Sequence, residues 1–173
     1  MIGSAGDRQV SLFAPFTLRT GPAYVVNIHR IRKITPHYDV YVGDRVRFSP
    51  HATIDGEPFR ASIFRNHYKE RKDGDRHEVC EKYRLWLMGE YETDRDQERR
   101  AATLYILPFL RGCVLGCWCR PLECHGDTLA ALINGELPYP VDWPDLQKEY
   151  PAEYIFEKYF RGVPCGTIGG VFR

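Results

Sequence analysis

The chain has 173 residues, 43% of them hydrophobic and 13% aromatic, which is enough to bury the core of one ordinary domain. Lys and Arg number 24 against 23 Asp and Glu, so the net charge gives no reason to expect a general polyanion binder. No apolar stretch approaches the roughly 20 residues that cross a bilayer, and no early run has the basic start and apolar core of a signal peptide. We therefore expect no membrane partner; oligomeric state is not encoded in these features.

Strand signals dominate the first part of the chain. Residues 1–22 have no periodicity and are interpreted as an N-terminal extension. Short β-branched or aromatic runs at residues 23–28 and 38–43 predict two strands. The segment 44–75 is long for a loop, so we expect a helix within it, at residues 64–72.

Helices and a further strand follow. Asp75 is a predicted N-cap of a helix that Gly89 ends, and residues 96–107 predict a second helix. Residues 113–119 are apolar on both faces, as in a central parallel strand, and residues 127–134 predict a last helix with Asp127 as its cap.

This alternation of strands and helices predicts an α/β fold with a single domain at residues 23–135. We expect an open, mostly parallel sheet with helices on both faces, Rossmann-like or flavodoxin-like. Residues 136–173 are interpreted as a C-terminal extension that packs on this domain.

The densest chemistry lies where the strand at residues 113–119 passes to the last helix. Cys117, Cys119, Cys124 and His125 fall within nine residues. In a strand, Cys117 and Cys119 face the same side about 7 Å apart, at the strand end where open α/β sheets bind ligands. The chain has six cysteines, and their crowding favours free thiols in an intracellular, reducing compartment over a disulfide framework.

Three interpretations of this cluster stay open. In the first, the N-terminus of the last helix activates the Cys124 thiolate and His125 transfers protons, with no cofactor. In the second, Cys117, Cys119, Cys124 and His125 bind zinc, although paired zinc ligands usually stand two to four residues apart. In the third, the cysteines are small apolar core residues.

The segment 115–129, Leu-Gly-Cys-Trp-Cys-Arg-Pro-Leu-Glu-Cys-His-Gly-Asp-Thr-Leu, resembles the signature of the domain-of-unknown-function 4326 family. Val25-Val26-Asn27 and the segment 38–43 are similar to the family's first and second strands, so the resemblance covers residues 23–135. It implies an α/β fold and the bacterial, phage and viral settings in which the family occurs, without an established reaction.

The resemblance also implies residues outside the cluster that position a substrate. Asn27 and Asp39 are expected near the sheet edge that carries Cys124. Arg45 and Arg120 have guanidinium groups that fit phosphate oxygens. The expected substrate-binding residues are Asn27, Asp39, Arg45, Arg120 and Asp127.

Our main hypothesis is an α/β enzyme, a transferase or hydrolase, that acts on a nucleotide, nucleobase or nucleic-acid-linked group. Cys124 and His125 are its expected reactive pair. The alternative is a non-catalytic module in which a Cys3His zinc site holds the strand-to-helix turn and the basic tract 60–76 contacts nucleic acid. Glu70, Asp73 and Asp75 weaken the basic character of that tract.

Overall fold

The computed structural model describes residues 21–28, 37–43, 53–54, 57–58, 61–91 and 96–159. At its centre lies a parallel sheet of three strands in the order β1 (Tyr24–Asn27), β5 (Val114–Cys117), β2 (Val40–Tyr41). β5 is the central strand, and Asn27 of β1 lies opposite Cys117 in the register. Each of the three strands lies within a run that the sequence predicted, although β2 and β5 are shorter than expected.

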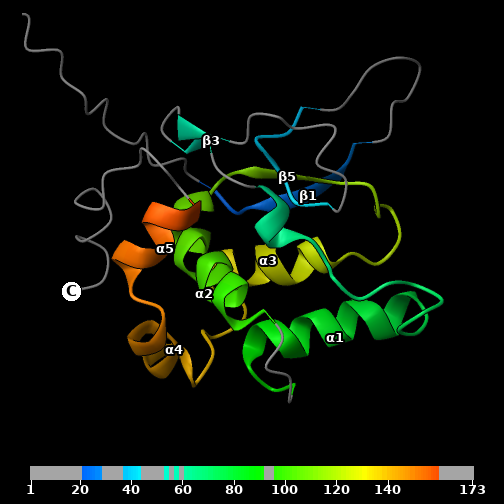
Figure 1. Ribbon diagram of the computed structural model, residues 1–173. Helices are drawn as coiled ribbons and strands as arrows, with labels where there is room; N and C mark the ends of the chain where they lie inside the picture. Colours follow the sequence, from blue (N-terminus) through cyan, green and yellow to red (C-terminus); the bar gives the residue numbers. More distant parts are fainter. Residues whose placement is uncertain are drawn as a thin grey trace, which may run out of the picture.

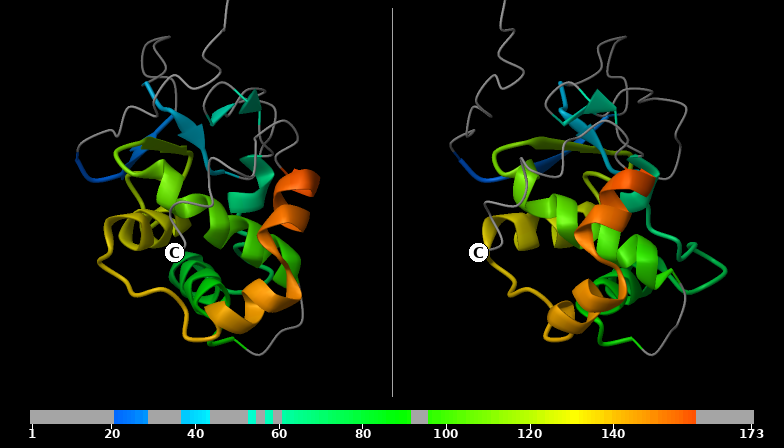
Figure 2. Two further views of the ribbon diagram at one scale, coloured as in Figure 1. Left: turned by 90° about the vertical axis from the view of Figure 1, so that its left-hand side faces the viewer. Right: turned by 60° about the vertical axis from the view of Figure 1, so that its left-hand side comes forward.

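The described part contains five α-helices, and all lie on one side of the sheet (Figure 1). They are α1 (Arg76–Met88), α2 (Gln97–Ile106), α3 (His125–Asn134), α4 (Trp143–Glu149) and α5 (Ala152–Tyr159). The short 3-10 helices η2 (Ala61–Phe64) and η3 (Leu107–Leu110) and the antiparallel pair β3 (Thr53–Ile54) and β4 (Glu57–Pro58) complete the elements. Two turned views keep the sheet above the helices (Figure 2). The fold is therefore α/β with a parallel sheet, and the described helices cover one face rather than both.

Local signals set the ends of α1. Asp75 accepts a hydrogen bond from the backbone of Glu78, and the Glu78 side chain binds the Asp75 backbone in return, which makes a capping box. Gly89 ends the helix in the left-handed conformation at φ 74°. Both boundaries were predicted, because each depends on residues within one turn of the helix end.

The helix expected at residues 64–72 is absent from the described structure. After η2 the chain makes turns instead, because side chains occupy the amide groups that a helix would use. Asn66 accepts from the backbone N–H of Tyr68 at 2.9 Å, and Asp73 accepts from that of Lys69 at 2.7 Å.

The last two helices pack on the body of the molecule. α5 packs against α2, and Arg100 of α2 forms a two-pronged ion pair with Asp142, at 2.6 Å to each carboxylate oxygen. Arg100 is buried and also donates to the carbonyl of Leu87 at 3.0 Å. Among the helices described, none has the length and apolar character to cross a membrane.

Candidate metal centre and adjoining pocket

The fold brings three thiols and one imidazole to a single point. Cys117 ends β5, Cys124 precedes α3, and the loop between them carries Cys119. The ligand atoms of Cys117, Cys119, Cys124 and His125 all lie within 4.8 Å of one another. Tetrahedral zinc with bonds of about 2.3 Å needs sulfur atoms about 3.8 Å apart, so small side-chain movements suffice to close the set around an ion.

His125 is oriented by a hydrogen bond that it donates to the residue after β2. Its Nε2 atom lies 2.9 Å from the backbone carbonyl oxygen of Val42, the residue after β2. A carbonyl only accepts, so Nε2 carries the proton and Nδ1 keeps its lone pair. Metal-binding histidines commonly donate their other ring N–H to such a carbonyl. The ring is buried and packs edge-on against Tyr83, with centroids 5.0 Å apart.

Cys124 is the N-cap of α3. Its Sγ accepts a hydrogen bond from the backbone N–H of Gly126 at 3.3 Å, and the residue is only 2% exposed. The prediction that Asp127 caps this helix was wrong, because α3 begins at His125 and places Asp127 inside its first turn. The Asp127 carboxylate pairs instead with the guanidinium of Arg120.

The proximity of the three thiols changes their acidity. Hydrogen bonding to Cys119 raises the pKa of Cys117 to about 12. Hydrogen bonding to Cys117, and then to Cys119, raises the pKa of Cys124. The pKa of Cys119 falls well below its ordinary value, chiefly because the thiols of Cys117 and Cys124 hydrogen-bond to its sulfur. The cluster thus concentrates negative charge on the Cys119 sulfur and keeps Cys117 and Cys124 protonated, so a bound cation would displace the protons of these two thiols.

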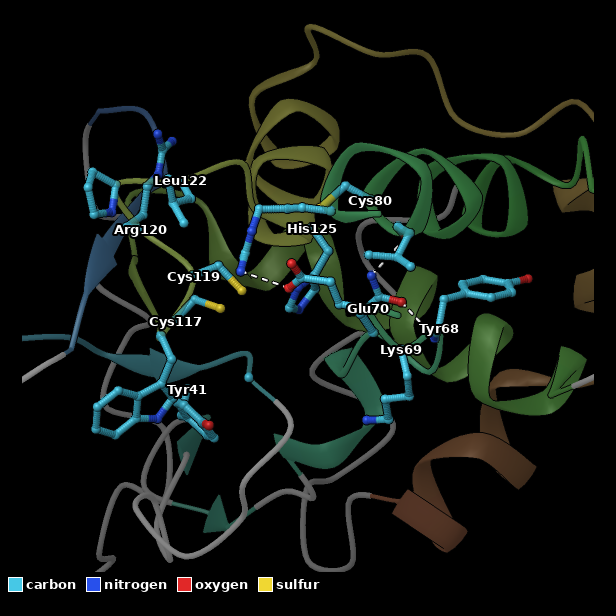
Figure 3. Close-up of a pocket in the computed structure, with 16 residues that line it drawn as sticks. Tyr41, Tyr68, Lys69, Glu70, Cys80, Cys117, Cys119, Arg120, Leu122 and His125 are labelled. Atoms are coloured by element: carbon cyan, nitrogen blue, oxygen red, sulfur yellow. Dashed lines mark hydrogen bonds and ion pairs between the residues drawn. The ribbon is translucent and has the colours of Figure 1, made fainter. Parts of the chain in front are cut away.

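A pocket of about 750 Å³ opens beside the cluster. Figure 3 shows the sulfur atoms of Cys117 and Cys119 close together and turned towards the side on which His125 lies. The pocket is lined by aromatic rings, cations, apolar side chains and members of the cluster: Tyr41, Gly43, Asn66, Tyr68, Lys69, Glu70, Arg76, Val79, Cys80, Cys117, Trp118, Cys119, Arg120, Pro121, Leu122 and His125. Cys124 is not among the lining residues.

Comparison with known protein families matches residues 22–135 to the family described as Domain of unknown function (DUF4326). The chain belongs to the DUF4326 family. The matched region contains the whole sheet and the cluster, whereas α4 and α5 lie beyond it. No curated protein and no solved structure matches the chain.

Within the DUF4326 region, the structure brings some expected site residues together and separates others. Arg120 and His125 line the pocket, and Asn27 lies beside Cys117 at the same end of the sheet. Asp39 lies at the opposite end, where its carboxylate accepts from the backbone of Val114 at 2.8 Å. Arg45 lies outside the described residues.

Several lining residues were not expected from the sequence. Tyr68, Lys69 and Arg76 belong to the basic tract 60–76, which the sequence analysis considered as a nucleic-acid contact but did not place beside the cluster. Cys80 lies on the buried face of α1, and the described structure leaves its thiol free beside the cluster. Burial raises the pKa of Cys80 to about 11. The aromatic residues interleaved with basic ones in the tract 60–76 were the one sequence feature that pointed to this side of the pocket.

Proposed function

We propose that this protein is a zinc-binding α/β module that holds a nucleotide-like group in the pocket beside its metal centre. The observation that carries the proposal is the convergence of four donor atoms within 4.8 Å, from Cys117, Cys119, Cys124 and His125. Three thiolates and an imidazole are the donor set that zinc prefers. Four protein ligands fill a tetrahedral ion, so the metal supplies structure and joins β5 to α3.

Burial of the cluster supports metal binding over a reactive thiol. Cys124 is 2% exposed and absent from the pocket wall, whereas a nucleophile must reach its substrate. The Val42 carbonyl fixes His125, and the Gly126 N–H donates to the Cys124 sulfur. Backbone groups that orient ligands in this way are typical of metal centres.

The lining of the pocket supports a nucleotide-like ligand. Tyr68 and Trp118 offer partly exposed rings on which a base can stack. Lys69, Arg76 and Arg120 line the pocket; Arg76 is held by Glu70 and Arg120 by Asp127, which positions two guanidinium groups for an anionic group. We also propose that the sheet is the centre of a Rossmann-like arrangement, since the pocket lies at the carboxyl end of the central strand β5.

Metal analysis of the purified protein tests the proposal. We expect one zinc per chain by native mass spectrometry and atomic emission, with zinc lost in Cys119→Ser. Cys80→Ser is the matched control, because it removes a buried thiol from the same pocket without touching the donor set. Equal zinc content in the two variants, or none in the wild type, contradicts the metal centre.

The same preparation tests a second candidate, an enzyme that uses Cys124 and His125 as its reactive pair. The observation in its favour is the Gly126 N–H that donates to Cys124 Sγ at a helix N-terminus, an arrangement that stabilises a thiolate. This enzyme is supported if the protein is metal-free and Cys124 is the one thiol alkylated at acidic pH. A zinc-loaded protein with an unreactive Cys124 rejects it.

A further inference from the structure

A turn at residues 69–74 lies beside the pocket, and two cationic residues, Arg71 and Lys72, lie at its tip. The turn projects between η2 and α1 (Figure 1). It is closed by hydrogen bonds from Arg71 N to Gly74 O at 2.8 Å and from Lys72 N to Lys69 O at 3.1 Å. Arg71 and Lys72 are both exposed, and Lys69 at the base of the turn lines the pocket. The turn thus continues the cationic wall of the pocket towards solvent.

The acidic residues of this tract are occupied by contacts within the protein. Glu70 pairs with Arg76 at 2.8 Å, and Asp73 accepts from the backbone N–H of Lys69 at 2.7 Å. Asp75 accepts from the backbone N–H of Glu78 at 2.9 Å as the cap of α1. These carboxylates therefore stabilise the turn and the start of the helix and are not directed at the cations of the tip.

The side chains of Arg71 and Lys72 do not take part in these stabilising contacts. Within the described ranges, neither side chain forms an ion pair or a hydrogen bond to another residue. Arg71 adopts the left-handed backbone conformation of a tight turn, at φ 72°, and the residue is exposed. Paired cations at the rim of an aromatic and basic pocket are suited to consecutive phosphates of a nucleic-acid strand.

We infer that the ligand of the pocket is one nucleotide of a single-stranded nucleic acid, whose neighbouring phosphates contact Arg71 and Lys72. This inference rests on the nucleotide-binding pocket proposed above. A single strand is required because a base inside a duplex is stacked and paired and does not reach a side-chain pocket. The turn then binds the backbone without reading sequence, while Tyr68 and Trp118 stack on the base.

Fluorescence anisotropy with labelled oligonucleotides of about 12 nucleotides tests this inference, since that length covers a typical single-strand site. Single-stranded DNA and RNA and a duplex of the same sequence are compared, with adenosine monophosphate as a competitor. The zinc-loaded wild type is expected to bind both single strands and to bind the duplex at least ten-fold more weakly. The double variant Arg71→Gln/Lys72→Gln is expected to bind the strands on the order of ten-fold more weakly at low salt.

The salt dependence of oligonucleotide affinity is a second measurement, and a purely structural effect of the two substitutions would not change it. Each lost phosphate contact reduces the slope of log affinity against log salt by about 0.7 for single strands, so the double variant should lose about 1.4. Arg111→Gln/Lys148→Gln is the matched control, because it removes two exposed cations from other elements, one after η3 and one in α4. Its slope and affinity should equal those of the wild type.

The outcomes separate this inference from the proposed function. Adenosine monophosphate should bind the wild type and the turn variant equally, because Arg71 and Lys72 do not line the pocket. If adenosine monophosphate binds but the single strands bind no tighter, the inference is wrong while the proposed nucleotide pocket is retained. The same conclusion follows if the turn variant keeps the wild-type slope of log affinity against log salt. If neither the monophosphate nor the strands bind, the nucleotide pocket itself is wrong. Equal affinity for duplex and single strand also overturns the inference.

Discussion

His125 Nε2 lies 2.9 Å from the carbonyl oxygen of Val42, so a backbone group at the end of β2 orients a side chain at the start of α3. This hydrogen bond spans 83 positions of the sequence. It ties an edge strand to the helix that follows the central strand. The contact fixes which ring nitrogen faces the thiols, and the chemistry of the cluster depends on that orientation.

Substitution of His125 tests this relationship. We expect His125→Ala to lower zinc affinity by on the order of 100-fold or more, because loss of a ligand costs at least as much as loss of its hydrogen-bonding partner. Competition with a chromophoric chelator measures the change, and far-UV circular dichroism checks that the variant is folded. His77→Ala, on the exposed side of α1, is the control and should keep the wild-type affinity. Unchanged affinity in His125→Ala would remove the imidazole from the donor set.

Two glycines near the cluster should differ in their tolerance of a methyl group. A Cβ at Gly116 would lie 2.7 Å from the Tyr38 ring and 2.8 Å from Ile28, too close for real carbon atoms. At Gly126 the nearest atoms are Val25 Cγ2 and Cys124 Sγ, at 3.2 and 3.3 Å. We expect Gly116→Ala to lower the free energy of unfolding by about 1–3 kcal/mol, as overpacking does, and Gly126→Ala to lower it less.

Urea denaturation of the two variants measures this order. Gly126→Ala should also weaken zinc binding, since its methyl group presses on a sulfur of the cluster, whereas Gly116→Ala should change zinc affinity little. The opposite ranking in either measurement would show that the packing at one of the two positions adapts more than these distances allow.

The ion pair between Arg100 and Asp142 should make stability depend on acid pH. The Arg100 guanidinium lowers the pKa of Asp142 below its ordinary value of 3.8. The pair therefore contributes its full stabilisation above about pH 3.8, and loses it as the pH falls through the lowered pKa. Asp142→Asn leaves a buried guanidinium without its charge partner. We expect a loss of about 2–3 kcal/mol, less than for a fully buried pair because Asp142 is half-exposed.

Thermal denaturation between about pH 2.5 and 7 measures both effects. The difference in stability between wild type and Asp142→Asn should be constant near neutral pH and should shrink below pH 3.8. Asp145→Asn is the control, since Asp145 lies in the first turn of α4, just after Asp142, in an exposed pair with Lys148. A difference that does not change with pH would argue against an electrostatic contribution from this pair.

His77 and Glu123 form a contact across the outside of the metal-binding loop. His77 Nδ1 lies 3.1 Å from Glu123 Oε1, and this hydrogen bond raises the pKa of His77 above 6.5. The contact therefore stabilises the fold below pH 6.5, and its contribution is lost as the pH rises through the raised pKa. In Glu123→Gln the His77 pKa should return towards 6.5, as followed by NMR titration of the imidazole protons. Glu136→Gln, at an exposed position after the end of α3, should leave it unchanged.

Elements that depend on near neighbours in the chain were predictable. The ends of α1 follow from Asp75 and Gly89, and the apolar run at residues 113–119 identified the central strand. The helix expected at residues 64–72 was wrong because Asn66 and Asp73 use their side chains to bind backbone amides. That helix was expected from the length of the segment 44–75, and segment length does not reveal such competition, which depends on the turn that finally forms.

The sequence by itself determined the central strand, the helix that follows it and the four candidate ligands, because their order and spacing are local properties of the chain. It did not decide between a metal set and a reactive pair, since spacing alone made Cys117 and Cys119 poor partners for Cys124 and His125. Folding bound the Asp73 carboxylate of the basic tract to the backbone of Lys69 within the turn. Tertiary structure brought the four donor atoms within 4.8 Å of one another and placed the Val42 carbonyl against His125. Such contacts join residues that are distant in sequence, and only packing of the sheet against the helices creates them.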